Sequence, residues 1–381
     1  MKNLKDCKVA LLVNFIPPYR IPLYTEIAKY VKELKIFIST YMEKNRNWKV
    51  EYKDLNVFKQ KCITIDRTHK HPHGFTDEIY IHIPYNTIKE LEEYSPDIII
   101  SGEMGLRSIL SMIYKIFHKN TKYILWATLS EYSELGRGLL RNIIRKWLIP
   151  KANAILVNGN SGKRYIKKFR VSDERLFFTP YTTDISKMLG LPLEKDSKQA
   201  RRMLIVSQLI ERKGLFQFFN ALNNWGINNR DKNIELLIVG DGILREKLEN
   251  FIFPDNISVK FVGSVPYEEV INYYKESGIF VFPTLSDEWG LVVNEAMACG
   301  LVILGSIYSQ AVEELVGSEN GFTFRPDCED EIINAISQIM TLTEEELNII
   351  RKKNREKISS LTPEYVAANV AKAMEFVINK F

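Results

Sequence analysis

Residues 283–300 read PTLSDEWGLVVNEAMACG and lie between two short apolar runs. The run before them, residues 278–282 (GIFVF), has the continuous hydrophobicity that is typical of a buried parallel strand. Residues 291–299 have a helical pattern that Gly300 ends, and residues 301–304 form a second apolar run. We therefore expect a strand, an acidic turn, a helix and a second strand.

The acidic turn has the features of an anion site. The start of the predicted helix presents unpaired backbone N–H groups and the positive end of the helix dipole. Gly290 allows a ligand to approach the backbone closely. Asp287 in the turn and Glu295 two turns into the helix place carboxylates on either side. Either acid alone is accounted for as well by a helix cap or a solvated helix position, but the whole string favours binding of hydroxyl groups around an anion.

Length and composition indicate an ordinary globular protein of two domains. The chain has 381 residues, of which 45% are hydrophobic and 26% charged. Apolar runs alternate with helical patterns in both halves, which predicts two doubly wound α/β domains with ligands at the carboxyl ends of their strands. The four cysteines show no paired spacing, and neither a secretory signal nor a membrane-spanning window is found. We expect a cytoplasmic protein.

Charge is distributed unevenly along the chain. Residues 1–200 hold 34 Lys+Arg and 21 Asp+Glu, a net charge of +13, whereas the remainder carries −8. Residues 135–172 contain ten cations and no acid, and residues 138–149 predict a basic amphipathic helix. We interpret its apolar stripe as core-facing, and its charge as favouring a peripheral position on an anionic inner membrane face. Nucleic acid is ranked low because no nucleic-acid-binding motif accompanies the basic run.

Three more strand–loop segments follow in the second half. Residues 203–206 lead into a loop with Lys213 and Gly214 before a helix, which is another anion-binding arrangement. Residues 236–239 end in the tight turn Gly240-Asp241-Gly242. Residues 259–263 predict a further strand that ends at Val262 and Gly263.

These segments together resemble the retaining glycosyltransferases of family 4, in which two acids separated by seven residues bracket an aromatic-Gly-Leu segment. Asp287 and Glu295 match the two acids, although the family usually has Glu at the first position and Glu288 is an alternative one place out of register. Lys213 matches the family's phosphate-gripping lysine, whereas Ser207 and Gln208 stand where Gly and Arg are usual. The resemblance covers residues 200–381 strongly and residues 1–190 weakly.

The resemblance implies a GT-B fold: two Rossmann-like domains with a cleft between them and a C-terminal crossover helix. Residues 1–190 would bind the acceptor, residues 191–362 the nucleotide sugar, and residues 363–381 would cross back to the first domain. The implied reaction moves a sugar from a nucleoside diphosphate sugar to an acceptor hydroxyl with retained anomeric configuration. The acceptor would be a glycan or lipid-linked molecule of surface polysaccharide or glycolipid assembly. No metal or other cofactor is implied, because the family uses protein cations instead.

Two alternatives are a non-catalytic subunit that binds a nucleotide sugar or lipid, and a nucleotide-sugar epimerase. The first is favoured by Gln208 and by the absence of the histidine that many family members carry near position 127. The second is disfavoured by the acidic string, which is not expected in epimerases.

The resemblance also assigns roles to residues. Lys213 would stabilise the leaving diphosphate, Asp287 would bind hydroxyls of the donor sugar, and Glu295 the ribose. Other donor-binding candidates are Ser207, Gln208, Arg212, Gly240, Asp241, Val262, Gly263, Glu288, Trp289, Gly290, Leu291 and Val292. On the acceptor side the candidates are the glycine-free loop residues Pro18, Tyr19 and Arg20, with Glu103 and Glu131 as replacements for the missing histidine.

Overall fold

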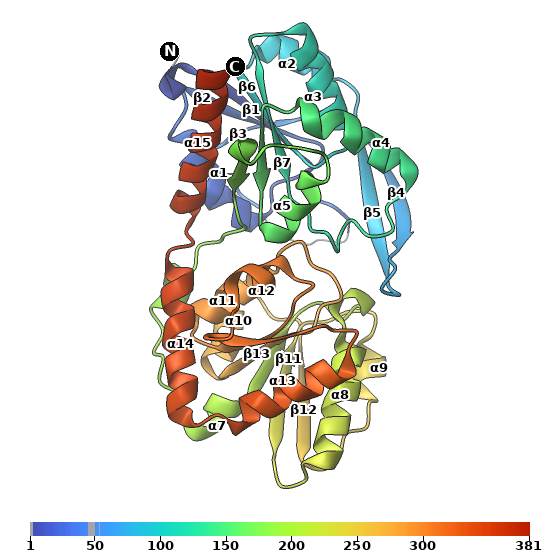
Figure 1. The fold of residues 1–381 in the computed structure, drawn as a ribbon, viewed down its shortest axis with the longest axis vertical. Coiled ribbons are helices and arrows are strands. Elements are labelled where there is room, and N and C mark those ends of the chain that lie inside the picture. The colour runs from blue at the N-terminus through green and yellow to red at the C-terminus, as the bar shows by residue number, and fades with distance from the viewer. Residues whose placement is uncertain (1–2, 45–49, 53) are drawn as a thin grey trace. The chain divides into compact units, whose positions relative to one another are not determined.

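The computed structural model describes residues 3–44, 50–52 and 54–381. Its contacts divide the chain into two compact units (Figure 1). Unit 1 comprises Met1–His71, Asp77–Asp184 and Thr362–Phe381, and unit 2 comprises Pro72–Thr76 and Ile185–Leu361. Each unit is built around its own parallel sheet, so the predicted doubly wound α/β architecture is confirmed.

The sheet of unit 1 has seven strands. Their order is β3 (Asn56–Lys59), β2 (Glu33–Ile38), β1 (Lys8–Val13), β6 (Ile98–Gly102), β7 (Lys122–Ala127), β8 (Ala154–Val157) and β9 (Leu176–Phe178). All neighbours pair in parallel. The direction of winding reverses between β1 and β6, and ligands of such sheets bind beyond the carboxyl ends of strands at this switch point.

Among the described residues of unit 1, the α-helices that accompany this sheet are α1 (Ile21–Ala28), α2 (Thr87–Tyr94), α3 (Leu106–Phe117), α4 (Leu139–Leu148), α5 (Asn160–Lys167) and α15 (Pro363–Lys380). The last helix packs against α1 and against β7, β8 and β9. It does so through Val366, Val370 and Val377, which recur on one helical face and are fully buried. A separate two-stranded sheet is formed by β4 (Cys62–Lys70) and β5 (Thr76–Pro84).

The sheet of unit 2 has six parallel strands. Their order is β12 (Ile257–Gly263), β11 (Ile234–Val239), β10 (Met203–Val206), β13 (Ile279–Phe282), β14 (Val302–Ser306) and β15 (Gly321–Phe324). Here the switch point lies between β10 and β13. The loops that follow these two strands therefore come together at one edge of the sheet.

Helices cover this second sheet through apolar faces. They are α6 (Ser186–Leu189), α7 (Ser197–Arg201), α8 (Leu215–Asn228), α9 (Arg245–Glu249), α10 (Tyr267–Lys275), α11 (Leu291–Ala298), α12 (Gln310–Leu315), α13 (Glu329–Thr341) and α14 (Glu344–Ser359). Phe218, Leu222 and Trp225 of α8 enter the core, where α8 packs against α13. On α11, Glu295 is buried instead of solvated, so this helix brings a carboxyl group inside the unit.

The expectation that α4 turns its apolar stripe to the core holds for Leu148, which is fully buried, and for Trp147, which packs against the core, but it is wrong for Leu140 and Ile143. Leu139, Leu140 and Ile143 are 83%, 71% and 62% exposed. The buried side chains of α4 are Leu148 and Arg145, because the Arg145 guanidinium forms an ion pair of 2.5 Å with the nearly buried Glu134 carboxylate. The inward side of α4 is thus held by this ion pair together with Leu148 and Trp147, whereas the apolar side chains of its first turns point outward.

The acid-free run also carries a smaller field than its composition indicates. Acids just outside the run pair with several of its cations: Asp173 with Lys163 and Lys167, and Glu131 with Arg164 and Lys168. These acids lie close to the cations in space but outside the acid-free run in the sequence, so a count along the sequence overstates the positive charge of this surface.

Candidate donor site

Two loops meet at the switch point of unit 2. The loop after β10 contains the short helix η5 (Glu211–Lys213), and the loop after β13 contains the acidic turn. The Lys213 ammonium nitrogen lies 2.7 Å from Oδ2 of Asp287, and a guanidinium nitrogen of Arg212 lies 3.5 Å from the same oxygen. The structure thus brings two cations that are neighbours in the sequence to a carboxylate that follows them by more than seventy residues.

Backbone contacts fix these loops to each other. The Leu285 amide donates to the Arg212 carbonyl over 2.9 Å, and the Arg212 guanidinium donates to the Ser286 carbonyl over 3.1 Å. Gly214 follows η5 with φ +67°, and a Cβ there would lie 2.1 Å from the Pro283 carbonyl oxygen. Only glycine allows this approach, so the Lys-Gly pair of the sequence sets the position of Lys213.

Asp287 is held in its ionised form. Burial alone would raise its pKa, but the Lys213 and Arg212 charges, with a hydrogen bond from the Trp289 amide, lower the pKa below its ordinary value. The side chain is 17% exposed, so the carboxylate remains reachable from solvent. Glu288, by contrast, has an exposed side chain, and its carbonyl accepts a hydrogen bond from Gln310 over 2.8 Å.

The start of α11 is anchored next to this ion pair. Gly290 has φ +106°, and a Cβ there would lie 2.7 Å from the Phe282 ring. Trp289 is buried, its indole N–H donates to Asn294 over 2.9 Å, and its carbonyl accepts from the Ser309 hydroxyl. Leu291 and Val292 form the first turn of α11; Leu291 is half-buried. The helix start is therefore fixed beside Asp287, as an anion site requires.

Glu295 lies between α11 and α10 with both oxygens occupied. The Tyr267 hydroxyl donates to Oε1 over 2.9 Å and the Tyr274 hydroxyl donates to Oε2 over 3.0 Å. Burial raises the pKa of Glu295 to about 7, although these two hydrogen bonds act in the opposite direction. The sequence analysis did not identify the two tyrosines. Their spacing of seven residues puts them on one face of α10, and this periodicity was the available signal.

The remaining donor candidates lie along the same sheet edge, after β10, β11 and β12. Gly240 has φ +136°, and a Cβ there would lie 1.9 Å from the Ser207 carbonyl oxygen, so these two loops touch. Ser207 is half-buried and Gln208 is exposed. Asp241 accepts hydrogen bonds from the Gly242 amide and from Arg245, over 2.7 and 3.0 Å.

The end of β12 supplies the last two candidates of unit 2. Val262 is half-buried and Gly263 is buried with φ +91°. The Gly263 carbonyl accepts a hydrogen bond from the Gly240 amide over 2.8 Å. Arg245 lies beside Gly263, which brings a cation to this part of the edge.

In unit 1, the loop after β1 contains η2 (Pro18–Arg20). Pro18 is exposed and Tyr19 is half-buried, but Arg20 is only 5% exposed. Its guanidinium carbon lies 3.9 Å from the centroid of the Tyr181 ring and 5.2 Å from that of Trp126. These cation–π contacts hold Arg20 within unit 1 as part of its packing.

The two acidic candidates of unit 1 have different surroundings. Glu103 follows β6 at the switch point with φ +61°, and its carboxylate accepts a hydrogen bond from Asn14, which follows β1. Glu131 binds Arg164 and Lys168 of unit 1 over 2.7 and 3.1 Å. Burial would raise the pKa of Glu131, but these two cations lower it. Glu103 is thus at the loop edge, whereas Glu131 is engaged by cations in and next to α5.

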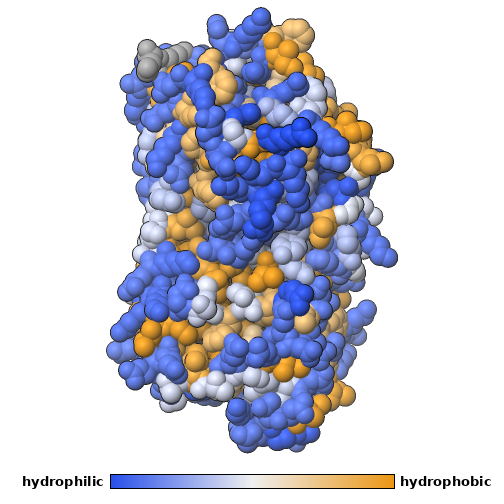
Figure 2. Space-filling view, in the orientation of Figure 1, coloured by the Kyte–Doolittle hydropathy of each residue, from blue (hydrophilic) through white to orange (hydrophobic). Residues whose placement is uncertain are grey.

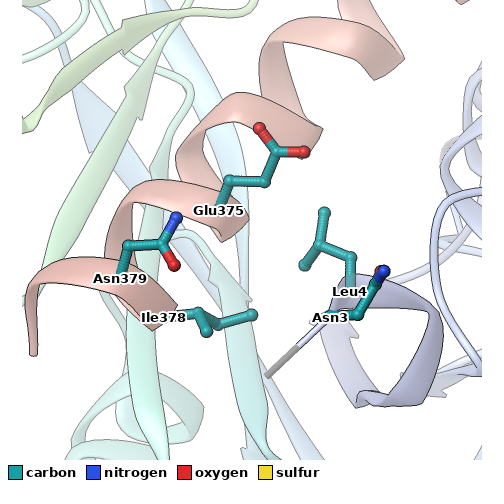
Figure 3. Close-up of a pocket in the computed structure, with 5 residues that line it drawn as sticks. All are labelled: Asn3, Leu4, Glu375, Ile378 and Asn379. Carbon is teal, nitrogen blue, oxygen red and sulfur yellow. The ribbon is translucent and has the colours of Figure 1, made fainter. Parts of the chain in front are cut away.

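A pocket of unit 1 contains none of these residues. It lies between η1 (Leu4–Asp6) and the end of α15, and is lined by Asn3, Leu4, Glu375, Ile378 and Asn379 (Figure 3). The close-up shows two aliphatic side chains and only one charged group, so the pocket lacks the convergent polar groups of a binding site.

Solved structures establish the class of the fold. The chain aligns with Anabaena HepE in complex with UDP, at 15% identity and a TM-score of 0.68, over 97% of this chain and 99% of that one. The lipopolysaccharide outer core galactosyltransferase WaaB aligns over 97% and 99%, at 14% identity and a TM-score of 0.67. The chain therefore has the GT-B fold, as predicted.

Sequence comparison then gives the family that part of the chain resembles. Residues 194–357 match the model of glycosyl transferases group 1, and this range contains every donor candidate of unit 2. An uncharacterized glycosyltransferase of Methanocaldococcus jannaschii is 25% identical over 75% of this chain and 74% of its own length. An α-1,4-N-acetyl-D-galactosaminyltransferase of Campylobacter jejuni, named for an acceptor carried on PP-undecaprenol, is 24% identical over 68% of both chains. Residues 194–357 are therefore similar to the glycosyl transferases group 1, and these relatives carry glycosyltransferase names.

Proposed function

We propose that the protein transfers a sugar from a nucleoside diphosphate sugar to an acceptor hydroxyl, with retained anomeric configuration and with protein cations in place of a metal. The observation that carries the proposal is the cluster of Lys213, Arg212 and Asp287 at the start of α11. A diphosphate gains charge as its bond to the sugar breaks. Fixed cations and a helix start stabilise that charge without reorganisation.

The roles follow from the chemistry of each group. Lys213 and Arg212 would hold the diphosphate, and the ionised Asp287 would accept hydrogen bonds from hydroxyls of the donor sugar. Glu295 would bind the ribose, with Tyr267 or Tyr274 yielding one hydrogen bond to a ribose hydroxyl. In the transfer itself, the bond from the anomeric carbon to the diphosphate oxygen breaks and the diphosphate leaves with its electron pair. The acceptor oxygen bonds to the anomeric carbon on the same face, and its proton passes to the departing diphosphate oxygen.

Similar proteins support more specific proposals for donor and acceptor. UDP occupies the HepE structure, which favours a UDP-sugar as donor. The acceptor of the C. jejuni relative favours a lipid-linked glycan, and a relative from Erwinia amylovora is named for amylovoran biosynthesis. No helix within the described residues has the length and apolar content needed to span a bilayer.

Calorimetry with UDP, GDP and a panel of their sugars tests the donor proposal. We expect binding of a UDP-sugar that Lys213→Ala and Glu295→Gln weaken. The matched control is Glu268→Gln, because Glu268 is exposed on α10, the helix that carries both tyrosines. Equal affinity of Glu295→Gln and wild type would remove Glu295 from the donor site. Tight binding without any diphosphate release would favour the non-catalytic alternative.

A further inference from the structure

The outward face of α4 is apolar, and binding of a nucleotide sugar in unit 2 does not explain why these apolar side chains are exposed. Leu139, Leu140 and Ile143 are among the most exposed hydrophobic side chains of unit 1. They follow one another at helical spacing, and Figure 2 shows hydrophobic surface gathered over α4. Contiguous exposed apolar surface on a helix indicates an interaction site.

The opposite face of α4 is firmly attached to unit 1. Leu148 is fully buried, and the Arg145–Glu134 ion pair is enclosed by protein on both sides. A buried pair of this kind is strongly destabilised when one partner is removed. The orientation of α4 is therefore fixed, and rotation of the helix cannot hide Leu140 and Ile143.

A cation borders the apolar face, because Lys146 is exposed and lies three residues after Ile143. Arg141 is half-buried and lies on the side of the helix that carries Arg145 and Leu148. Glu134, the nearest acid before the helix, faces its buried side. Long basic side chains beside an apolar strip can extend to phosphate groups while the strip enters the acyl region.

We propose that α4 lies in the interface of an anionic bilayer, with Leu139, Leu140 and Ile143 inserted and with Lys146 at the lipid phosphates. A second copy of the chain is a poorer occupant. A two-fold contact through the exposed face of α4 would bring Lys146 close to the same cation of the partner. Three side chains are also far too few for the roughly 800 Å² that each partner buries in a stable interface. The inference goes beyond the proposed function and does not depend on it.

Sedimentation of the full chain with phosphatidylcholine–phosphatidylglycerol vesicles tests this insertion, with no donor present. We expect wild-type protein to bind at low salt and to remain partly bound at high salt, since buried apolar side chains are not screened. Leu139→Gln, Leu140→Gln and Ile143→Gln together should lower the partition coefficient at least about tenfold. The matched control is Ile243→Gln with Ile252→Gln, because these unit 2 residues are 84% and 88% exposed. This control should bind as the wild type does.

Unchanged binding of the triple variant, or complete release of wild-type protein by salt, would contradict insertion. Wild-type protein that ignores the vesicles but forms dimers that the triple variant cannot form would assign the face to a second copy and overturn the proposal.

Discussion

Replacing Glu295 by glutamine should make the protein more stable at pH 8 and less stable at pH 4. In the folded chain the pKa of Glu295 is raised from 4.5 to about 7, because the carboxyl group is buried and no cation is among the groups that shift it. Below pH 4.5 both the folded and unfolded states hold the proton. Between pH 4.5 and 7 the unfolded state loses its proton first, so the free energy of unfolding falls as pH rises.

The size of the effect follows from the pKa difference. A rise from 4.5 to about 7 corresponds to about 3 kcal/mol of stability lost by pH 8, at about 1.4 kcal/mol per pKa unit. The glutamine side chain would avoid this loss but would weaken one of the two tyrosine hydrogen bonds, at a cost of about 1 kcal/mol at every pH. The variant should therefore be about 1 kcal/mol less stable than wild type at pH 4, about equal to it at pH 5 and about 2 kcal/mol more stable at pH 8.

Urea unfolding at several pH values measures this difference, with the fluorescence of Trp225 and Trp289 reporting on unit 2. Glu268→Gln on the exposed side of α10 is the control and should parallel wild type throughout. A difference between Glu295→Gln and wild type that stays constant from pH 5 to pH 8 would refute the reasoning, because it would mean that the buried carboxyl titrates normally.

Three further predictions concern the meeting point of the two loops. Asp287→Asn should reduce turnover more than Glu288→Gln does, because Asp287 faces the cations; the reverse order in a steady-state assay would assign the role to Glu288. Lys213→Ala should lower kcat about 100-fold and change donor affinity less, since the leaving diphosphate gains charge; titration calorimetry beside kinetics separates the two quantities. Gly214→Ala should cost about 2 kcal/mol or more in urea unfolding because its Cβ would meet a backbone carbonyl, whereas Gly190→Ala, whose Cβ has ordinary contacts, should be nearly neutral.

Much of the fold was predictable because the strands are continuous apolar runs. Residues 278–282 and 301–304 appear as β13 and β14 with the acidic turn and α11 between them, as the pattern indicated. Gly214 and Gly290 could be placed at loop–helix junctions because each directly precedes a helical pattern. The GT-B fold and the similarity of residues 194–357 to the glycosyl transferases group 1 followed from the same segments.

Features that depend on distant neighbours were not predictable. The pairing of Lys213 with Asp287 joins loops that only the strand order brings together. The stripe of α4 was assigned to the core because an apolar face is usually buried, but only Trp147 and Leu148 of it reach the core, and the Arg145–Glu134 pair occupies the rest of the inward side. The raised pKa of Glu295 likewise results from burial against α10, and the sequence around Glu295 contains no sign of it.

The central claim is retaining transfer from a nucleoside diphosphate sugar bound at α11, and proton NMR of donor hydrolysis tests it without knowledge of the acceptor. The protein is incubated with UDP-sugars so that water accepts the sugar, and the anomer formed first is identified before mutarotation. We predict UDP release with the first-formed sugar in the anomeric configuration of the donor, and loss of both signals in Asp287→Asn. A first-formed sugar of inverted configuration, or hydrolysis that persists unchanged in Asp287→Asn, would contradict the account.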